Sequence, residues 1–365
     1  MSYEQRIKLY QKIIEHRKKP LLTYVTSIRP FKSMNMDSDA IESIVTQIDA
    51  IPEEHNSIDF LIISNGGDPI TSLRIISILR ERFEQVSVLV PYVAYSAATV
   101  LALGANEIVM HPYSNLGPVD PQLTISKTSG DGIRTFSSED IAHFVTFLKN
   151  DIGITDQEYL MNAFLKLSDS VDPVSIGFVK RSQQLTFFLS KKMLETHMSD
   201  ENKIKEISKA LNTSFYNHAY AVDRKEAESI GLPIAGSNPE IEKLLWSVWL
   251  DFADEMQCNK AFNLLSELMK HEEVRKFMNE VPCIEVPAGL PENKVNDFYS
   301  KILNDSKIIR NPVQLKHLLV SIESINFAKQ LSQIETINYW RDSNLNFQCN
   351  GTSYIDDWIK VEAEN

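Results

Sequence analysis

IDFLIISNGGDPITSLRIISILRERFEQVSVLVPYVAYSAATVLALGANEIVMHP, residues 58–112, decides the fold of this chain. Its apolar, β-branched runs predict strands, and two runs with helical periodicity separate them. The strand runs are residues 58–64, 86–92 and 107–112, and the helical runs are residues 68–83 and 96–105. The strand runs are continuously apolar, as in a parallel sheet that helices cover on both faces. We therefore expect an α/β fold with a largely parallel sheet.

The sequence on either side first extends this pattern and then changes. Residues 3–17 have the periodicity of an amphipathic helix, and residues 21–28 and 37–51 predict a further strand and helix. From about residue 137 to residue 230 the periodicity is helical throughout. The strands are therefore expected to come first and the helices to follow.

A boundary is expected near residue 236. Residues 232–240 collect Pro, Gly, Ser and Asn, the composition of a connecting segment. We expect a first domain over residues 1–236 and a mainly helical C-terminal region of unknown role over residues 237–365. That region reads as helical through about residue 334 and as mixed beyond it.

Composition excludes several classes of protein. Of the 365 residues, 43% are hydrophobic and 24% are charged, as in a soluble globular protein, and the net charge of −12 disfavours nucleic acid as a partner. Three widely spaced cysteines, Cys258, Cys283 and Cys349, fit free thiols in a reducing compartment. The charged start is no secretory signal, and no run reaches the roughly 18 apolar residues of a transmembrane segment. We expect a cytoplasmic protein.

Ser96 follows the second of these strands and opens the helix behind it. A serine at such a turn can stand away from the sheet, at the positive end of a helix dipole that favours a developing oxyanion. The small side chains of Ala97, Ala98 and Ala102 leave room for a substrate carbonyl. The turn resembles a nucleophile elbow without the GxSxG spelling. For this stretch alone, a serine that only caps its helix is the simpler interpretation.

A second feature, ISNGGDP at residues 63–69, joins the first strand of the stretch to its helix. Paired glycines leave the main chain uncovered, so Gly66 and Gly67 can present N–H groups to an oxyanion. A turn that only needs positive φ is the alternative interpretation. Because both turns lie at strand ends of one sheet, we expect a cleft between them. A third loop, SNLGPVDPQL at residues 114–123, follows the next strand, and its Gly-Pro and Asp-Pro pairs predict a rigid loop, with an ordinary surface turn as the alternative interpretation.

Three segments together resemble the serine dehydrogenase proteinase family: DFLIISNGGD, VPYVAYSAATVLALGANEIVMHPYSNLGPVDPQ and NHAYAVDRKEAESIGLPI. That family is related to the proteolytic Clp subunit, signal peptide peptidase A and the crotonases. The resemblance covers about residues 7–234. It implies a ClpP/crotonase-like spiral of ββα units that places two glycine-rich loops beside the nucleophile. It also implies a homo-oligomer, since relatives assemble into rings or trimers.

The resemblance further implies roles for single residues. Ser96 falls on the nucleophile position, and Gly66 and Gly67 fall on the oxyanion loop. The family uses a Ser, Asp, His triad in that chain order. His218 matches its histidine motif, and Asp120, in GPVDPQ, is the candidate for the acid that orients the histidine.

Two departures from the family pattern bear on turnover. Ala98 stands where the family usually has glycine, which narrows the space beside the nucleophile by one methyl group. The family's histidine is commonly followed by Asp-Tyr-Pro, whereas residues 219–221 are Ala, Tyr and Ala. The second change removes a carboxylate from the neighbourhood of the base.

Several groups compete for the role of base or acid. A serine hydroxyl needs a base to take its proton, and His218 suits neutral pH, although an exposed histidine without a partner is an equal alternative. Lys180 is the rival base, because signal peptide peptidase A relatives pair serine with lysine. It would have to be desolvated, and a lysine that reaches solvent is the simpler interpretation. Asp172 and Asp223 are weaker acid candidates, more simply caps or surface charges, and we expect His111 to precede a turn and face solvent.

We expect a serine peptidase that acts on peptide or protein substrates. Ser96 attacks a carbonyl, N–H groups of the Gly66–Gly67 loop and of Ala97 hold the oxyanion, and His218 or Lys180 moves the proton. Two other classes stay open: a catalytically inactive scaffold that binds peptides or protein partners, and a crotonase-like acyl-CoA enzyme, which gives Ser96 no role. No cofactor is expected, and no metal, because the histidines and cysteines lack metal-ligand spacing.

Overall fold

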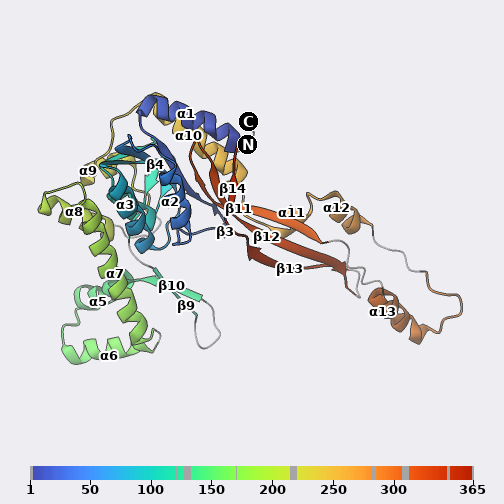
Figure 1. The fold of residues 1–365 in the computed structure, drawn as a ribbon. Helices are drawn as coiled ribbons and strands as arrows, with labels where there is room; N and C mark the ends of the chain where they lie inside the picture. The colour runs from blue at the N-terminus through green and yellow to red at the C-terminus, as the bar shows by residue number, and fades with distance from the viewer. Residues whose placement is uncertain are drawn as a thin grey trace.

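The computed structural model describes residues 3–119, 122–126, 133–169, 171–213, 220–280, 285–305, 312–342 and 346–363. Its centre is an α/β body built around one large sheet (Figure 1). The sheet has the strand order β13-β12-β11-β1-β4-β5-β7. The four parallel strands are β1 (Leu21–Thr26), β4 (Ser57–Ile63), β5 (Gln85–Val90) and β7 (Glu107–Met110). The predicted α/β fold with a largely parallel core is confirmed.

Helices cover both faces of the parallel strands. Successive side chains point to opposite faces, so Leu22 and Tyr24 lie in one core cluster while Leu21 and Val25 lie in the other. The first face is covered by α2 (Ala40–Asp49), α3 (Pro69–Arg82) and α4 (Ala97–Leu103), and the second by α1 (Tyr3–Arg17) and α10 (Pro239–Glu255) (Figure 1). The strands read as continuously apolar because neither face meets solvent.

Short strands form a second layer at the carboxyl ends of the parallel strands. β5 continues into β6 (Val93–Ala94) before α4, and β7 continues into β8 (Asn115–Leu116). β6 pairs with β8 in parallel, Ser64 pairs with Ala94, and Leu116 pairs with Val222. The units of β5 and β7 therefore each give one strand to the central sheet and one to this layer, β4 reaches the layer through Ser64, and the expected spiral of ββα units is confirmed.

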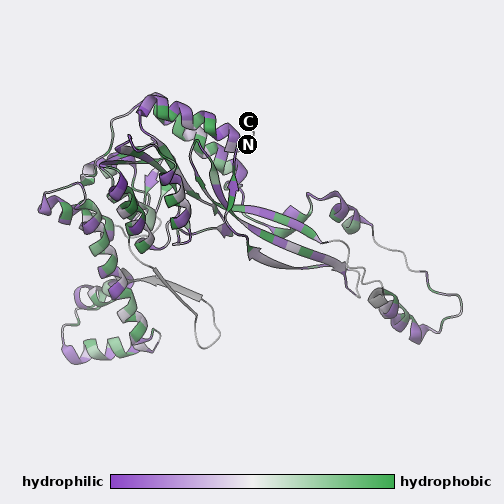
Figure 2. Cartoon of the chain, in the orientation of Figure 1, coloured by the Kyte–Doolittle hydropathy of each residue, from purple (hydrophilic) through white to green (hydrophobic). Residues whose placement is uncertain are grey.

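Part of the segment that the sequence predicts as helical stands away from the sheet (Figure 1). After the hairpin β9 (Gln122–Ser126) and β10 (Ile133–Ser137), the segment contains α5 (Ser138–Thr146), the π-helical turn η1 (Phe147–Asp151), α6 (Gln157–Ser168), α7 (Pro173–Leu194), α8 (Glu201–Thr213) and α9 (Arg224–Ile230). The part around α5 and α6 stands away from the sheet, whereas the end of α7, α8 and α9 pack into the core beside the parallel strands. Figure 2 shows apolar residues on α6, although none of its residues is buried. None of the described helices combines the length and the apolar composition that a membrane crossing requires.

The C-terminal region is helical only in its first part. The helical prediction is confirmed for α10, α11 (Leu264–Leu268), α12 (Glu272–Asn279), the 3₁₀ turn η2 (Glu292–Lys294) and α13 (Val295–Asp305). It is wrong for β11 (Val313–Glu323) and β12 (Ala328–Arg341), which form an antiparallel pair and continue into β13 (Phe347–Ile355) and β14 (Ile359–Val361). Leu331, Ile334 and Ile337 recur at every third residue and imitate a helix, but pairing with β11 imposes a strand.

These C-terminal strands belong to the central sheet. β11 pairs antiparallel with β1, and the Ser27 amide donates to the Leu319 carbonyl at 2.7 Å. The hairpin of β2 (Ile28–Arg29) and β3 (Lys32–Ser33) contacts the pair from the side, where Lys32 Nζ donates to Gln333 Oε1 at 2.8 Å. The predicted domain boundary at residue 236 stays a prediction. Hydrogen bonds of the central sheet connect β1, before this boundary, with β11, after it.

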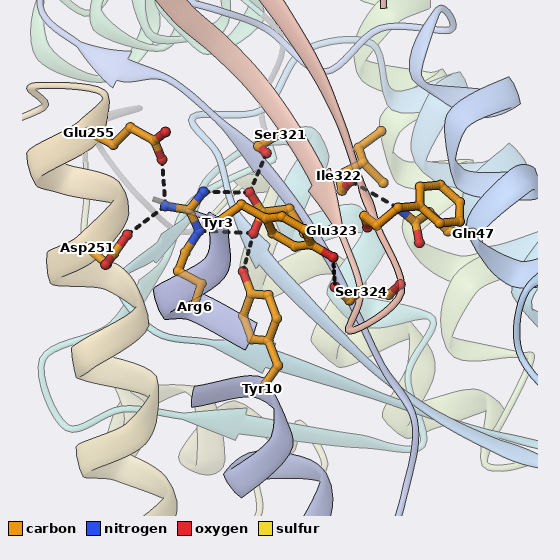
Figure 3. A network of polar contacts seen from close by, with 11 residues as sticks. Tyr3, Arg6, Tyr10, Gln47, Asp251, Glu255, Ser321, Ile322, Glu323 and Ser324 are labelled. Atoms are coloured by element: carbon orange, nitrogen blue, oxygen red, sulfur yellow. Dashed lines mark hydrogen bonds and ion pairs between the residues drawn. The ribbon is translucent and has the colours of Figure 1, made fainter. Parts of the chain in front are cut away.

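A buried cluster of charged side chains connects the N-terminal helix α1 to α10 and β11 of the C-terminal region (Figure 3). Arg6 of α1 donates to both carboxylate oxygens of Glu323 on β11, at 2.9 and 2.7 Å. The same guanidinium donates to Asp251 at 2.6 Å and to Glu255 at 2.5 Å, both on α10. Tyr10 donates to Glu323 at 2.7 Å. The side chains of Arg6 and Glu323 are fully buried, so this cluster fixes α1, α10 and β11 relative to one another.

Candidate active site

Ser96 occupies the sharp turn between β6 and α4. Its backbone has φ 52° and ψ −117°, and non-glycine residues rarely adopt positive φ. The residue is half-buried at the N-cap of α4, yet its side chain makes no capping hydrogen bond. Its hydroxyl bonds to no residue in the part of the chain that the structure describes. The interpretation of Ser96 as a side-chain cap is therefore wrong, and the turn has the backbone of a nucleophile elbow.

The glycine loop lies against this turn. Gly66 has φ 98°, and a Cβ atom added there would lie 2.5 Å from the Tyr95 carbonyl oxygen and 2.9 Å from both the Ala97 nitrogen and Ser96 Cβ. No larger residue fits without moving one of the two backbones. The structure thus brings Gly66, Ser96 and Ala97 together, as the sequence predicts.

Hydrogen bonds fix the direction of the loop's peptide groups. The Gly66 amide donates to Ser64 Oγ at 3.0 Å, and the Gly66 carbonyl accepts from the Met36 amide at 2.8 Å. Met36 also accepts from the Asp68 amide at 3.0 Å. Among the described residues, the Gly67 amide finds no acceptor. Because N–H and C=O point oppositely across a trans peptide, the bond from Met36 turns the Gly67 N–H away from that segment.

The first turn of α4 supplies a second available amide. The Ala97 N–H belongs to the first turn, where helix geometry offers no partner, and it too finds no acceptor within the described residues. Ser72 of α3 donates to the Ala97 carbonyl at 2.6 Å and fixes this residue from behind. Ala98 is fully buried in the core, so the methyl group that departs from the family pattern packs inward.

Hydrogen bonds hold the third predicted loop to the layer formed by the short strands β6 and β8. Thr99 Oγ1 on α4 accepts from the Gly117 amide at 3.0 Å. Leu116 and Val222 exchange two backbone hydrogen bonds of 3.0 and 2.9 Å, and the Val119 amide donates to the Leu211 carbonyl at 3.0 Å. The chain after β8 therefore runs beside the segments that precede and follow residues 214–219.

The candidates for acid and base are placed unequally. His218 and Asp120 lie outside the described residues. Lys180 on α7 is exposed and donates to Gln183 at 3.0 Å, so within this chain it lacks the desolvation that a lysine base requires. Asp172 accepts from the Ser175 amide at 2.9 Å and Asp223 from the Glu226 amide at 2.9 Å. These two aspartates are the helix caps of the simpler interpretation.

His111 departs from its prediction. It precedes a turn as expected, but it is buried, and the prediction that it faces solvent is wrong. Its ring stacks on Trp246 of α10 with centroids 4.7 Å apart, and Nδ1 accepts from the Tyr113 amide at 3.1 Å. Burial lowers the pKa of His111, which favours the neutral ring. The sequence gives no sign of this because α10 is more than a hundred residues away along the chain.

Sequence reasoning missed three hydroxyl groups that support the site. These belong to Ser72, described above, and to Thr26 and Ser64, whose oxygens lie 2.8 Å apart. Ser64 stands inside the ISNGGDP stretch, so its proximity to the glycines was visible. Its partner Thr26 is 38 residues away on β1, and only the parallel register brings the two strands together.

Comparison with known proteins finds a family match over part of the chain. Residues 6–137 match the sequence model of the ClpP-like SDH-type serine proteinases. This match covers the turn at Ser96 and the glycine loop. The resemblance to the serine dehydrogenase proteinase family is confirmed over these residues.

Two curated relatives come from Methanocaldococcus jannaschii. The uncharacterized protein MJ0137 is 28% identical over 199 residues, which is 54% of this chain and 60% of the relative. The uncharacterized protein MJ1495 is 25% identical over 198 residues, which is 54% of this chain and 58% of the relative. The chain thus spans about three fifths of the length of these relatives.

Two solved structures are also similar. A mutant of the 1510-N membrane-bound stomatin-specific protease has 16% identity and a TM-score of 0.36, over 62% of this chain and 84% of that chain. ClpP1 from Listeria monocytogenes has 14% identity and a TM-score of 0.32, over 64% of this chain and 99% of that chain.

Proposed function

We propose that the protein is a serine peptidase in which Ser96 is the nucleophile. The observation that carries the proposal is the Ser96 turn, with positive φ and a hydroxyl that does not cap its helix, set against the Gly66–Gly67 loop. The match of residues 6–137 to ClpP-like serine proteinases supports the same chemistry. A hydroxyl held in this way at a helix N-terminus meets a carbonyl whose oxygen the neighbouring amides can bind.

In the proposed reaction, Ser96 Oγ forms a bond to the carbonyl carbon of a peptide. The Gly67 and Ala97 amides, which have no acceptor among the described residues, bind the resulting oxyanion. The Gly66 amide does not bind the oxyanion, because it is already bonded to Ser64. Gly66 instead lets the loop approach Ser96 closely and sets the direction of the Gly67 amide. The base takes the hydroxyl proton and gives it to the leaving amine, and water then releases the acyl group from Ser96.

We assign the base to His218 and the orienting acid to Asp120. Support comes from their described neighbours: the Leu116–Val222 pair and the bond from Val119 to Leu211 bring both chain segments to the layer that carries Ser96. Along the chain, Asp120 is one residue from Val119, and His218 is four residues from Val222.

A homo-oligomer is proposed as the working form. The twelve-residue helix α6 has no buried residue, although Tyr159, Met161 and Leu165 are apolar and more than half exposed. Exposed apolar surface of this extent on a helix is typical of a protein interface. Peptides or proteins are the proposed substrates, and the free thiols of Cys258 and Cys349 are compatible with the cytoplasmic location, which stays a prediction.

A fluorophosphonate probe tests the proposal on the full chain. We expect the wild type to be labelled and Ser96→Ala to lose all labelling, because the probe phosphonylates an activated serine oxygen. Ser77→Ala, on the exposed face of α3, is the matched control and should label normally. Absence of labelling in folded wild-type protein would refute the peptidase and favour the inactive scaffold.

The assignment of the base has its own test. His218→Ala should reduce the labelling rate by several orders of magnitude, as loss of the base does in a catalytic triad, whereas Lys180→Ala should leave it within twofold. The reverse result would replace the histidine by the lysine and would require Lys180 to be desolvated in the assembled form.

A further inference from the structure

Two buried hydroxyl groups lie directly behind the glycine loop. The side chains of Ser64, after β4, and Thr26, on β1, are fully buried, and their oxygens are 2.8 Å apart. Ser64 Oγ also accepts the Gly66 amide at 3.0 Å. The backbone amide of Ser64 donates to the Val93 carbonyl of β6, and its carbonyl accepts from the amide of Tyr95 just after β6, so the side chain starts from a fixed point.

These contacts set the direction of the Gly67 amide. The bond to Ser64 fixes the peptide group on the amino side of Gly66, and the bond from Met36 fixes the one on its carboxyl side. Gly66 has φ 98°, and glycine has no side chain to restrict its backbone, so these bonds help to hold the two peptide planes in place. Gly67 N–H, the proposed donor to the oxyanion, belongs to the second of these planes.

We propose that Ser64 and Thr26 are positioning residues of the oxyanion site, an inference that rests on the proposed peptidase function. Ser64 accepts the Gly66 amide and thereby fixes the peptide group before Gly66, so that the bond from Met36 to the Gly66 carbonyl can hold the Gly67 amide in one direction. Thr26 shares a hydrogen bond with the Ser64 hydroxyl from the neighbouring strand and holds its rotamer. Neither hydroxyl touches the substrate, so removal of either one should slow the chemical step and leave substrate binding almost unchanged.

The rate constant and the affinity of fluorophosphonate labelling separate these effects. For Ser64→Ala we expect the maximal labelling rate to fall about 10- to 100-fold, less than the about 100- to 1000-fold loss of an oxyanion donor itself. The probe concentration at half-maximal rate should change less than twofold. Thr26→Val should lose less than Ser64→Ala, and Thr26→Ser, which keeps the hydroxyl, should restore the wild-type rate.

Two matched variants control for buried hydroxyl loss elsewhere in the sheet. Ser87→Ala removes a buried hydroxyl that donates to Glu107 and accepts from Lys19 at the amino end of β5. Thr23→Val makes the same change as Thr26→Val, three residues earlier on β1, at a buried hydroxyl that lies beside Tyr10 and not beside the glycine loop. Both should be labelled at the wild-type rate even where their melting temperatures change.

The possible results of these experiments separate the positioning role of Ser64 and Thr26 from the proposed peptidase function. If the wild type and Ser64→Ala are labelled at the same maximal rate, the positioning role is wrong and the peptidase stands. If Thr26→Ser loses as much as Thr26→Val, packing and not the hydroxyl is responsible, and the inference fails for Thr26. If the folded wild type is not labelled at all, both proposals fall.

Discussion

Replacing Arg6 by methionine perturbs the buried cluster of Figure 3. Methionine fills much of the same space without charge, which leaves Glu323, Asp251 and Glu255 facing one another. The Glu323 side chain is fully buried and that of Asp251 is 3% exposed, so water cannot compensate them. Breaking such a pair from one side costs about 3–5 kcal/mol of the free energy of unfolding. At about 2 °C per kcal/mol for a large domain, the melting temperature should fall by about 6–10 °C.

The effect should depend on pH with a definite sign. Burial raises the pKa of Glu255, and Arg6 acts against that rise. In Arg6→Met the opposing charge is gone, so the pKa in the folded state moves further above its unfolded value. A carboxyl group of this kind favours the folded state at low pH, and that contribution is lost as the pH rises through the raised pKa. The deficit of Arg6→Met should therefore be larger at pH 7.5 than at pH 5.

Thermal unfolding of the full-length variants, followed by calorimetry, measures both quantities. The double variant Arg6→Met with Glu323→Gln is the internal control: it removes one uncompensated charge and should melt above Arg6→Met alone. A deficit below about 2 °C, or one that stays constant between pH 5 and pH 7.5, would contradict the account of an uncompensated buried charge.

Three further outcomes are expected. Gly66→Ala should abolish fluorophosphonate labelling, because its Cβ would lie 2.5 Å from the Tyr95 carbonyl oxygen, whereas Gly153→Ala, also at positive φ but with no atom within 4 Å, should label normally. His111→Phe should keep full labelling, and its melting temperature should fall less than that of the wild type between pH 7.5 and pH 5.5. The reason is that a histidine whose pKa is lowered by burial stabilises the fold at high pH and loses that contribution as the pH falls. An equal fall in both proteins would contradict a lowered pKa of His111. Tyr159→Ser on α6 should lower the molar mass measured by light scattering while the melting profile of the monomer is unchanged, and an unaltered mass would place the oligomer interface elsewhere.

The parallel core was predictable because its signals are local. The strands β4, β5 and β7 are short, continuously apolar and flanked by turn residues, and the helices between them start at Pro69 and Ala97, just after the glycine loop and Ser96. The C-terminal strands were not predictable in the same way. β12 carries apolar residues at a spacing of three, and its pairing with β11, β13 and β14 makes it extended.

The same difference between local signals and contacts of distant residues applies to the candidate active site. The Ser96 turn and the Gly66–Gly67 loop each follow a strand, so their meeting could be predicted from the order of elements. The contact between Thr26 and Ser64 depends on the register of β1 and β4, and the burial of His111 depends on α10. Such contacts between residues distant in sequence leave no local pattern.

The position of β11 has a consequence for how the protein is made and shortened. On a ribosome, β1 emerges almost 300 residues before the strand that covers its outer edge. Throughout that interval β1 offers unpaired amides and carbonyls to any extended segment nearby. A fragment ending at residue 236 would keep that edge bare permanently, so we expect it to aggregate or to demand a chaperone, even though it retains both turns that meet at Ser96.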